Sequence, residues 1–377
     1  MKLDTLYGSS LTVPFKVAFR HAAAERAATQ TVWVTARADG LAGYGEGCPR
    51  EYVTGESLHS AGSFIARYAP DLRASVHDLP ALRSWAHQHV SDIDRNPAAW
   101  AAVELALLDL IAKVGHTSVE SLLGMPAIHG RFRYTAVLGD AAPAQFAAQL
   151  AHYLKAGFRD FKVKLAGDES RDSAKVRVLK EAGLSGRAVR IDANNVWHRA
   201  HDAIEALEAL DFRFYAIEEP LQPGDYAGMA RLAAVLDTKI ILDESVLGPE
   251  QLDRIPGAPE RWIVNLRVSK MGGVLRSLEV VSDLRRRRLG LIIGAQVGET
   301  SVLTRAALTV AHAARDILVA QEGAFGTHLL ERDVVEPPLM FGSGGKLDVS
   351  ETALTGHGWG LSVNLPAADL ASLPGSQ

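Results

Sequence analysis

Short apolar runs recur along the chain from about residue 133 onward, and amphipathic helical segments separate most of them. The runs occupy residues 134–138, 161–165, 189–193, 214–217, 240–242, 262–266, 289–293 and 317–320. The clearest helical segments between them are 143–156, 173–182, 201–210 and 275–287. Eight strands that alternate with helices within roughly 190 residues favour a closed parallel barrel over an open doubly wound sheet. The first strand is also not followed by the Gly-x-Gly-x-x-Gly sequence that is typical of a dinucleotide-binding fold.

The first 125 residues have a different pattern. Residues 29–38 roughly alternate apolar and polar side chains, and Asp39-Gly40 forms a turn into residues 42–46, which is typical of a β-hairpin. Helical patterns follow, and the longest spans residues 97–114. The predicted divisions are an N-terminal α+β domain at residues 1–125, a barrel at 126–345 and a C-terminal segment at 346–377 that packs back on the first domain.

Composition narrows the class of protein. The net charge of −4 argues against a nucleic-acid partner, which would normally face a basic surface. The single cysteine, Cys48, excludes an intramolecular disulfide and indicates a reducing compartment. No apolar stretch reaches the ~18 residues that a membrane span needs, and no basic segment leads into an apolar one at the N-terminus. We therefore expect a cytoplasmic protein without a membrane or nucleic-acid partner.

Three acidic residues each stand where an apolar run ends. They are Asp192, Glu218 and Asp243, separated by 26 and 25 residues, which is about one strand–helix repeat. Lys164 lies on the second predicted strand and Lys270 just after the sixth. Because the second and sixth strands of an eight-stranded barrel face each other, the carboxylates would line one wall with a lysine at each end. Hard oxygen ligands favour Mg²⁺, or Mn²⁺, over zinc.

This set of residues suits the removal of a proton next to a carboxylate. The enediolate that forms is doubly negative, and a divalent cation stabilises that charge while a lysine with a lowered pKa takes the proton. Lys162 lies on the same strand face as Lys164 and would supply the second positive charge that lowers this pKa. Asn194 and Glu244 are expected beside the metal ligands, although Asn194 could instead cap the following helix.

Five motifs at the strand ends carry a family resemblance. They are Lys162-Val-Lys164, Asp192-Ala-Asn194, Ile217-Glu-Glu-Pro220, Asp243-Glu244-Ser and Lys270-Met-Gly-Gly273. Together they resemble the muconate-lactonizing-enzyme subgroup of the enolase superfamily, within the mandelate racemase/muconate lactonizing enzyme family. Residues 43–46 and 104–109 also look like that family's N-terminal domain. The resemblance covers nearly the whole chain and implies a modified TIM-like (β/α)7β barrel with an N-terminal α+β capping domain.

The resemblance also implies roles for single residues. Asp192, Glu218 and Asp243 would be ligands of Mg²⁺, Lys164 and Lys270 would be the acid and base, and Lys162 would assist Lys164. Glu299, after the seventh strand, resembles an acidic residue that relatives place near the site. Two capping loops, at about residues 14–28 and 50–56, would cover the barrel mouth. Arg20, His21, Arg26 and Tyr52 on these loops are therefore candidates for substrate specificity.

The chain departs from the family pattern at two positions. Arg267 stands where many relatives have another lysine, outside the catalytic set. After the eighth strand the chain reads Gln321-Glu322-Gly, whereas dipeptide epimerases usually carry Asp-x-Asp there to hold the substrate's α-ammonium. A typical dipeptide substrate is therefore disfavoured, although Glu322 could partly substitute.

The expected reaction is the racemisation or epimerisation of an amino-acid derivative, which is a small-molecule carboxylate. The same residues would also serve the cycloisomerisation of a muconate-like diacid, or a dehydration in the manner of o-succinylbenzoate synthase. A barrel that only bound a ligand would have no need of five positioned charges. Because barrels of this family are often oligomeric, we also expect a homo-oligomer.

Overall fold

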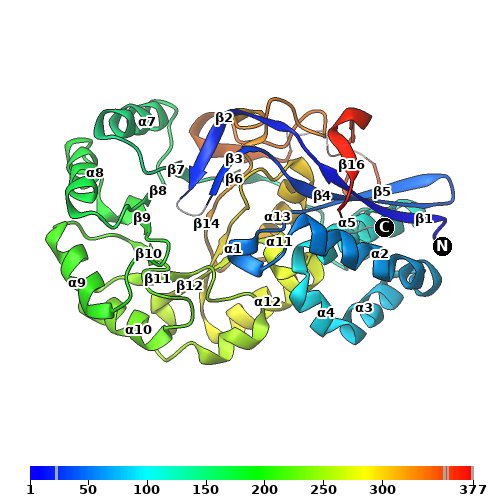
Figure 1. Ribbon diagram of the computed structural model, residues 1–377, viewed down its shortest axis with the longest axis horizontal. Coiled ribbons are helices and arrows are strands. Elements are labelled where there is room, and N and C mark those ends of the chain that lie inside the picture. The colour runs from blue at the N-terminus through cyan, green and yellow to red at the C-terminus, as the bar shows by residue number, and fades with distance from the viewer. Residues whose placement is uncertain (22–23, 351–353, 355, 375–377) are drawn as a thin grey trace.

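The computed structural model describes residues 1–21, 24–350, 354 and 356–374, and all their side chains except those of residues 18–21, 24 and 25. Eight parallel strands form one curled sheet in the order β14-β13-β12-β11-β10-β9-β8-β7 (Figure 1). Their bounds are β7 (Ala136–Leu138), β8 (Phe161–Lys164), β9 (Val189–Asp192), β10 (Ala216–Glu218), β11 (Lys239–Leu242), β12 (Trp262–Leu266), β13 (Gly290–Ile293) and β14 (Leu318–Gln321). The backbone N–H of Thr135, beside β7, donates to the carbonyl oxygen of Gln321 over 2.8 Å and joins the two edges of the sheet.

Helices connect consecutive strands along the outside of the barrel. They are α7 (Pro143–Lys155), α8 (Glu169–Glu181), α9 (Ala200–Ala209), α10 (Tyr226–Val235), the 3₁₀ helix η2 (Pro249–Arg254), α11 (Val268–Met271) with α12 (Val274–Arg287), and α13 (Ser301–Ala313). The fifth connection is thus a 3₁₀ helix rather than an α-helix. Across residues 136–321, which are described throughout, seven connections and a final strand confirm the predicted (β/α)7β barrel.

The barrel strands alternate between two packing layers, as the two-residue period of a strand requires. Ile241 lies in a small cluster inside the barrel with Ala216, Ile263, Ile292 and Ala320. Its neighbours Ile240 and Leu242 belong to the large core that the helices cover. Such strands read as nearly continuous apolar runs because both of their faces are buried.

The N-terminal domain has the predicted α+β composition. A four-stranded sheet with the order β16-β1-β4-β5 contains β1 (Thr5–Leu11), β4 (Thr31–Ala38), β5 (Leu41–Gly47) and β16 (Leu370–Ser372). A separate hairpin pairs β2 (Pro14–His21) with β3 (Ala24–Ala28). The helices are α1 (Glu51–Thr54), α2 (Leu58–Ser75), α3 (Leu79–Gln88), α4 (Val90–Arg95), α5 (Pro97–Val114) and α6 (Val119–Leu122).

The C-terminal tail is less irregular than its sequence indicates. Strand β16 pairs with β1, and β15 (Lys346–Asp348) pairs with β6 (Arg131–Arg133). Strands of three residues are too short to show a period in the sequence, and these form by pairing with a segment that is distant along the chain. The domain boundaries at residues 125 and 345 stay predictions.

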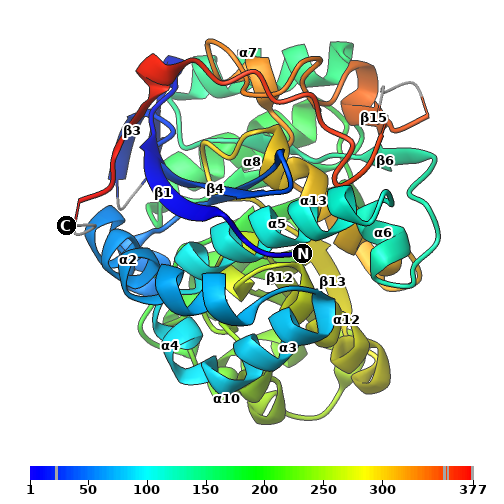
Figure 2. The ribbon, with the colours of Figure 1, turned by 90° about the vertical axis from the view of Figure 1, so that its right-hand side faces the viewer.

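Strand β5 lies directly on the backbone of helix α5 because three alternate residues of the strand are glycine. A Cβ atom on Gly43, Gly45 or Gly47 would come within 2.2, 2.0 or 1.9 Å of the carbonyl oxygens of Ala106, Ala102 and Ala98, respectively. Alternate positions share one face of a strand, and positions four apart share one face of a helix. Any larger residue at these glycines would therefore force the strand away from the helix. Figure 2 shows α5 between the N-terminal sheet and the barrel.

Buried glutamates of the N-terminal domain cap helices. Glu56 accepts from backbone N–H groups at the start of α5. Glu46 accepts from the N–H and hydroxyl of Thr300 at the start of α13, over 3.1 and 2.7 Å. Glu104 accepts from the N–H of Val274 at the start of α12 over 2.5 Å. Burial raises the pKa of Glu46 to about 8, and the pKa values of Glu56 and Glu104 to about 7. Two barrel helices therefore begin at carboxylates from the other domain.

The raised pKa of Glu46 predicts a stability that falls with pH. Because the folded state binds the Glu46 proton more tightly than the unfolded state, stability from this group is lost as pH rises from about 4.5 to about 8. In Glu46→Gln this contribution is absent, so the variant should gain stability relative to the wild type by at most about 1.4 kcal/mol per pH unit. Urea unfolding at several pH values would measure the difference. If the free energies of unfolding of the two proteins changed with pH in parallel, the prediction would be contradicted. Glu51→Gln, at an exposed position, serves as the control.

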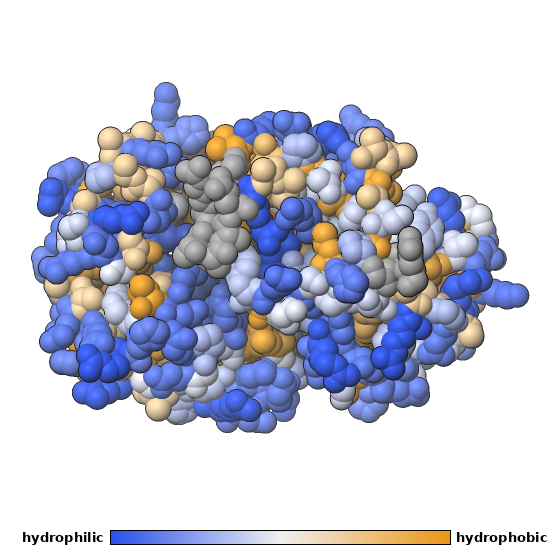
Figure 3. Space-filling model, viewed as in Figure 1, coloured by the Kyte–Doolittle hydropathy of each residue, from blue (hydrophilic) through white to orange (hydrophobic). Residues whose placement is uncertain are grey.

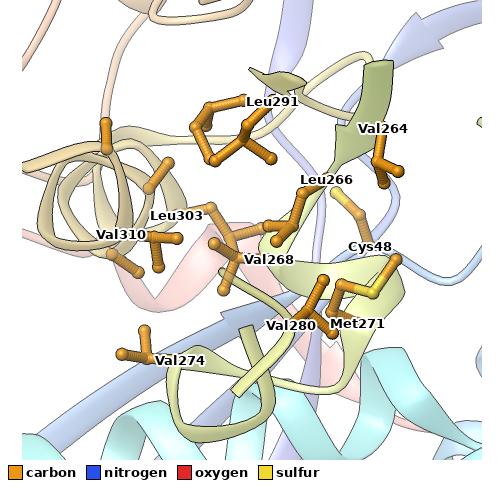
Figure 4. Close-up of a cluster of buried hydrophobic side chains, with 14 of the residues drawn as sticks. Cys48, Val264, Leu266, Val268, Met271, Val274, Val280, Leu291, Leu303 and Val310 are labelled. Carbon is orange, nitrogen blue, oxygen red and sulfur yellow. The ribbon is translucent and has the colours of Figure 1, made fainter. Parts of the chain in front are cut away.

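The two domains share one apolar core around α11. Cys48 of the N-terminal domain packs in this core with residues of β12, α11 and α13, including Leu266, Met271 and Leu303 (Figure 4). The backbone N–H of Cys48 donates to Ser269 Oγ over 2.7 Å. The position of α11 therefore depends on both domains. Among the described helices, none has the length and apolarity to cross a membrane.

Candidate active site

The three predicted acidic residues come together at the carboxyl ends of neighbouring strands. Asp192 ends β9, Glu218 ends β10, and Asp243 directly follows β11. Asp192 and Glu218 are Cα partners in the parallel register. The three residues are only 3%, 1% and 1% exposed. The strand ends thus form a continuous wall of buried carboxylates.

Lys162 and Lys164 lie beside this wall on β8. The Lys162 ammonium is 2.8 Å from Glu218 Oε2, 3.1 Å from Glu322 Oε2 and 3.4 Å from Asp192 Oδ2. Burial alone would lower the pKa of Lys162, but Glu218, Glu322 and Asp192 outweigh it and raise the pKa well above its ordinary value. Lys164 Nζ lies 3.4 Å from Asp192 Oδ2 and 3.3 Å from Asn194 Oδ1. Lys162 is therefore a fixed positive charge, and Lys164 faces the pocket beside it.

Lys270 lies at the opposite end of the wall, on α11. Its ammonium donates to Asp243 Oδ1 over 2.8 Å, to the Asp243 carbonyl oxygen over 2.7 Å and to the Asn265 carbonyl oxygen over 2.8 Å. The Lys270 side chain is fully buried. Arg267 also pairs with the Asp243 carboxylate, and its other branch donates to Gln296 Oε1 over 2.9 Å. Asp243 is thus held by two cations.

The predicted neighbours of the carboxylates lie close to them. Asn194 donates its backbone N–H to Asp192 Oδ1 over 3.2 Å, and its side-chain oxygen accepts from Lys164. It does not cap the following helix, which begins at Ala200 without a side-chain cap, so that alternative was wrong. Glu244 lines the pocket, where burial and the charge of Asp243 raise its pKa.

On the far wall, Glu299 Oε1 accepts from the backbone N–H of Gln296 over 2.7 Å, and burial raises the pKa of Glu299 to about 7. Glu322 follows β14 and points to Lys162, with Arg190 at 3.7 Å on its other oxygen. Both carboxylates border the pocket.

A pocket of about 680 Å³ lies at the barrel mouth, and its lining includes Lys162, Lys164, Asp192, Asn194, Glu244, Arg267, Glu299 and Glu322. Glu218, Asp243 and Lys270 are buried and are not among the lining residues. Val17 and Tyr52 of the capping domain and Gln145, Gln149 and Tyr153 of α7 also line it. On the face of the molecule that Figure 3 shows, hydrophilic residues predominate and the hydrophobic ones form small separate groups.

The structure places the four candidate specificity residues of the capping loops differently relative to the pocket. Tyr52 lines the pocket. Arg26 is not among the lining residues and donates to Gln30 Oε1 over 2.8 Å. Arg20 and His21 are on β2, but their side chains lie outside the described residues.

The donor set fits a hard divalent cation by its chemistry. Within the described residues no three His, Cys, Asp or Glu side chains are arranged to hold a metal ion, because the carboxylates turn to lysines and Arg267. Burial raises the pKa of Glu218, and repulsion from Asp192 and Asp243 adds to this although Lys162 opposes it. Buried carboxylates that repel one another at adjacent strand ends are oxygen ligands of the kind that Mg²⁺ prefers.

Comparison with known proteins places this site in a family. Residues 7–124 match the family described as mandelate racemase/muconate lactonizing enzyme, N-terminal domain, and residues 145–368 match the one described as enolase C-terminal domain-like. The chain belongs to the muconate lactonizing enzyme subgroup of the enolase superfamily. The resemblance of its motifs to that subgroup is thereby confirmed.

Relatives of this enolase-superfamily chain are isomerases. An L-Lys-D/L-Arg epimerase of Methylococcus capsulatus is 30% identical over 90% of this chain and 93% of the relative. The crystal structure of an N-succinyl Arg/Lys racemase from Bacillus cereus has a TM-score of 0.82 at 23% identity and covers 97% of this chain and 96% of that one. That of a dipeptide epimerase from Enterococcus faecalis, complexed with Mg and the dipeptide L-Leu-L-Tyr, has a TM-score of 0.79 at 24% identity and covers 96% and 100%. This enolase-superfamily chain is therefore an enzyme, an isomerase.

Two side chains of the superfamily site were not predicted from the pattern. Glu219 fixes the backbone around Asp243, because its Oε1 accepts from the N–H groups of Asp243 and Ser245 over 2.7 and 2.8 Å. Burial raises the pKa of Glu219 to about 7. Arg267, which the sequence places outside the catalytic set, reaches Asp243 and the pocket. Glu219 could have been found because it is the second acidic residue of the motif Ile217-Glu-Glu-Pro220. Arg267 could have been found because it replaces a lysine of the family pattern.

Proposed function

We propose that this enzyme removes the proton α to a carboxylate and returns it, and so racemises or epimerises an amino-acid derivative in the presence of Mg²⁺ or Mn²⁺. The observation that carries the proposal is the placement of Lys164 and Lys270. They stand at the carboxyl ends of β8 and β12, four strands apart in the eight-stranded sheet, and the carboxylate-bearing strands β9 to β11 lie between them. Two amines on opposite sides of a substrate's α-carbon are what a two-base proton transfer requires. Lys164 lines the pocket, whereas Lys270 is buried against Asp243 and is not among the lining residues.

In this proposal Asp192, Glu218 and Asp243 hold the cation. When bound, it would offset the negative charge that gathers on the substrate carboxylate as the α-proton leaves. Lys164, which faces the pocket, takes the proton from one side of the α-carbon. Lys270, whose ammonium donates to Asp243 Oδ1, returns a proton on the other side. Lys162, whose pKa its carboxylate neighbours raise well above the ordinary value, stands beside Lys164 as a fixed positive charge.

In this proposal the substrate is an N-acyl amino acid whose acyl group carries no ammonium, unlike a dipeptide, in which the N-terminal residue carries one. An ammonium would need an available carboxylate at the end of β14. Glu322, the carboxylate at that position, already pairs with Lys162 at 3.1 Å and lies 3.7 Å from Arg190. The pocket lining includes the neutral side chains of Gln145, Gln149 and Tyr153, which can hydrogen-bond an amide or acyl oxygen. The cytoplasmic location and the homo-oligomer expected from the sequence stay predictions.

Proton exchange in D₂O tests the proposal. The protein with Mg²⁺ would be incubated with separate pools of N-acyl amino acids, dipeptides and muconate-type diacids, and the products read by mass spectrometry. N-acyl amino acids should gain one deuterium and lose optical purity, without any other change in mass. Consumption of a diene, or loss of water from a substrate, would instead identify a cycloisomerase or a dehydratase. Exchange of dipeptides only would contradict the absence of an ammonium from the substrate's acyl group.

A further inference from the structure

Behind the proposed base Lys164, helix α8 carries a buried lysine that the mechanism does not use. Lys175 is 1% exposed. Its ammonium donates to the carbonyl oxygen of Lys164 over 2.8 Å and to Asp172 Oδ1 over 2.9 Å, and it pairs with Asp140 Oδ1 at 2.8 Å. A lysine ammonium has three N–H donors, and here three acceptors lie within hydrogen-bonding distance. A buried charge is tolerated only when it is satisfied in this way, so the contacts define the local geometry.

The partners of Lys175 surround the segment that follows Lys164. Asp172 also accepts from the backbone N–H groups of Ala166 and Gly167, over 2.8 and 2.9 Å, and so fixes the turn that leaves β8. Asp140 borders the pocket on the loop after β7. Lys175 therefore links the end of the base-bearing strand, the turn after it and the adjacent pocket wall.

We infer that Lys175 is a positioning residue for Lys164, an inference that rests on the proposed two-lysine function. It acts through the Lys164 carbonyl and Asp172, and it has no corresponding contact with Lys270, which belongs to α11 and is held by Asp243 and Asn265. A displacement of about 1 Å at a catalytic group lowers a rate by about 10²-fold. Loss of the Lys175 ammonium should therefore weaken one half of the proton transfer and spare the other.

The test compares Lys175→Met with Lys180→Met. Lys180 is on the same helix, and it is a 44% exposed lysine that pairs with Asp211 on the surface, so its loss should change neither half-reaction. In Lys175→Met, deuterium exchange of the enantiomer served by Lys164 should fall by about 10²-fold, while exchange of the other enantiomer should stay within about threefold. The retained half-reaction shows that the variant is folded. Lys175→Arg, which keeps a charged donor, should recover most of the loss.

A second measurement does not depend on turnover. Competitive acetylation, located by tandem mass spectrometry, gives the reactivity of each lysine amine in the protein as it stands. Lys175→Met should change the labelling rate of Lys164 by about threefold or more and leave that of Lys270 unchanged, since an amine's reactivity follows its surroundings. Asp172→Asn should change the labelling rate of Lys164 in the same way. This variant replaces Lys175→Met in the test if Lys175→Met does not fold.

The outcomes separate the inference from the proposed function. Equal loss of exchange for both enantiomers, or unchanged labelling of Lys164 in both variants, would overturn the positioning role. If the wild type exchanges no substrate, the proposed function fails. The labelling experiment then still decides whether Lys175 controls the environment of Lys164.

Discussion

Replacing Lys164 or Lys270 by alanine should abolish racemisation while each variant keeps α-proton exchange with one enantiomer. The two amines approach the α-carbon from opposite sides in the proposal, so each removes the proton of only one configuration. A positioned acid or base contributes about 10²–10⁴-fold to a rate, and the lost half-reaction should fall by that factor. Proton NMR in D₂O on the separate enantiomers would measure both halves independently.

Lys239→Ala is a suitable control for these variants, because Lys239 starts β11 at the opposite end of the barrel from the site. It should exchange both enantiomers at the wild-type rate. If Lys270→Ala kept exchange with both enantiomers, a single base would suffice, and an elimination or a cycloisomerisation would then explain the site better.

Removal of the divalent cation should abolish the activity of the enzyme and lower its thermal stability. Mg²⁺ would offset the repulsion among Asp192, Glu218 and Asp243, and a ligand present at 100 times its Kd stabilises a folded protein by about 2.7 kcal/mol. Chelation should therefore lower both the activity and the Tm, and added Mg²⁺ should restore them. Because burial raises the pKa of Glu218 and a metal binds its ionised form, affinity for Mg²⁺ should increase as pH rises.

Titration calorimetry and thermal unfolding would measure this effect in matched variants. Glu218→Gln should lose the Mg²⁺-dependent rise in Tm together with the activity. The exposed Glu205→Gln on α9 should keep both. A Tm that responds to Mg²⁺ equally in the wild type and in Glu218→Gln would place the cation elsewhere and contradict the assignment.

The sequence predicted the barrel well because its signal is local and repeated. Each of the eight apolar runs overlaps a strand, and strand β12 has the predicted bounds. Asp192, Glu218 and Asp243 could be placed together because a parallel strand–helix repeat brings every carboxyl end to the same rim. The spacing of two residues between Lys162 and Lys164 likewise settled that they share a face.

Contacts between distant segments could not be predicted in this way. Glu322 faces Lys162 because closure of the sheet brings the end of β14 near β8, and no periodicity reports the register of that closure. Lys175 appears in the sequence as one of several charged residues of a helix, and only tertiary packing places it under Lys164. The pairing of Arg267 with Asp243 depends in the same way on the fold of two successive loops.

The glutamates that cap α12 and α13 have a consequence for engineering. Glu46 and Glu104 belong to the N-terminal domain. They nevertheless accept hydrogen bonds from backbone N–H groups at the N-terminal ends of two barrel helices that flank Lys270. The two domains are therefore not interchangeable modules. A chimera that received the N-terminal domain of a relative would need carboxylates at both positions and glycines along β5 to seat α5. Loop grafts confined to the barrel mouth, around Val17 and Tyr52, would leave these contacts between the domains intact. They are therefore better suited to altering specificity.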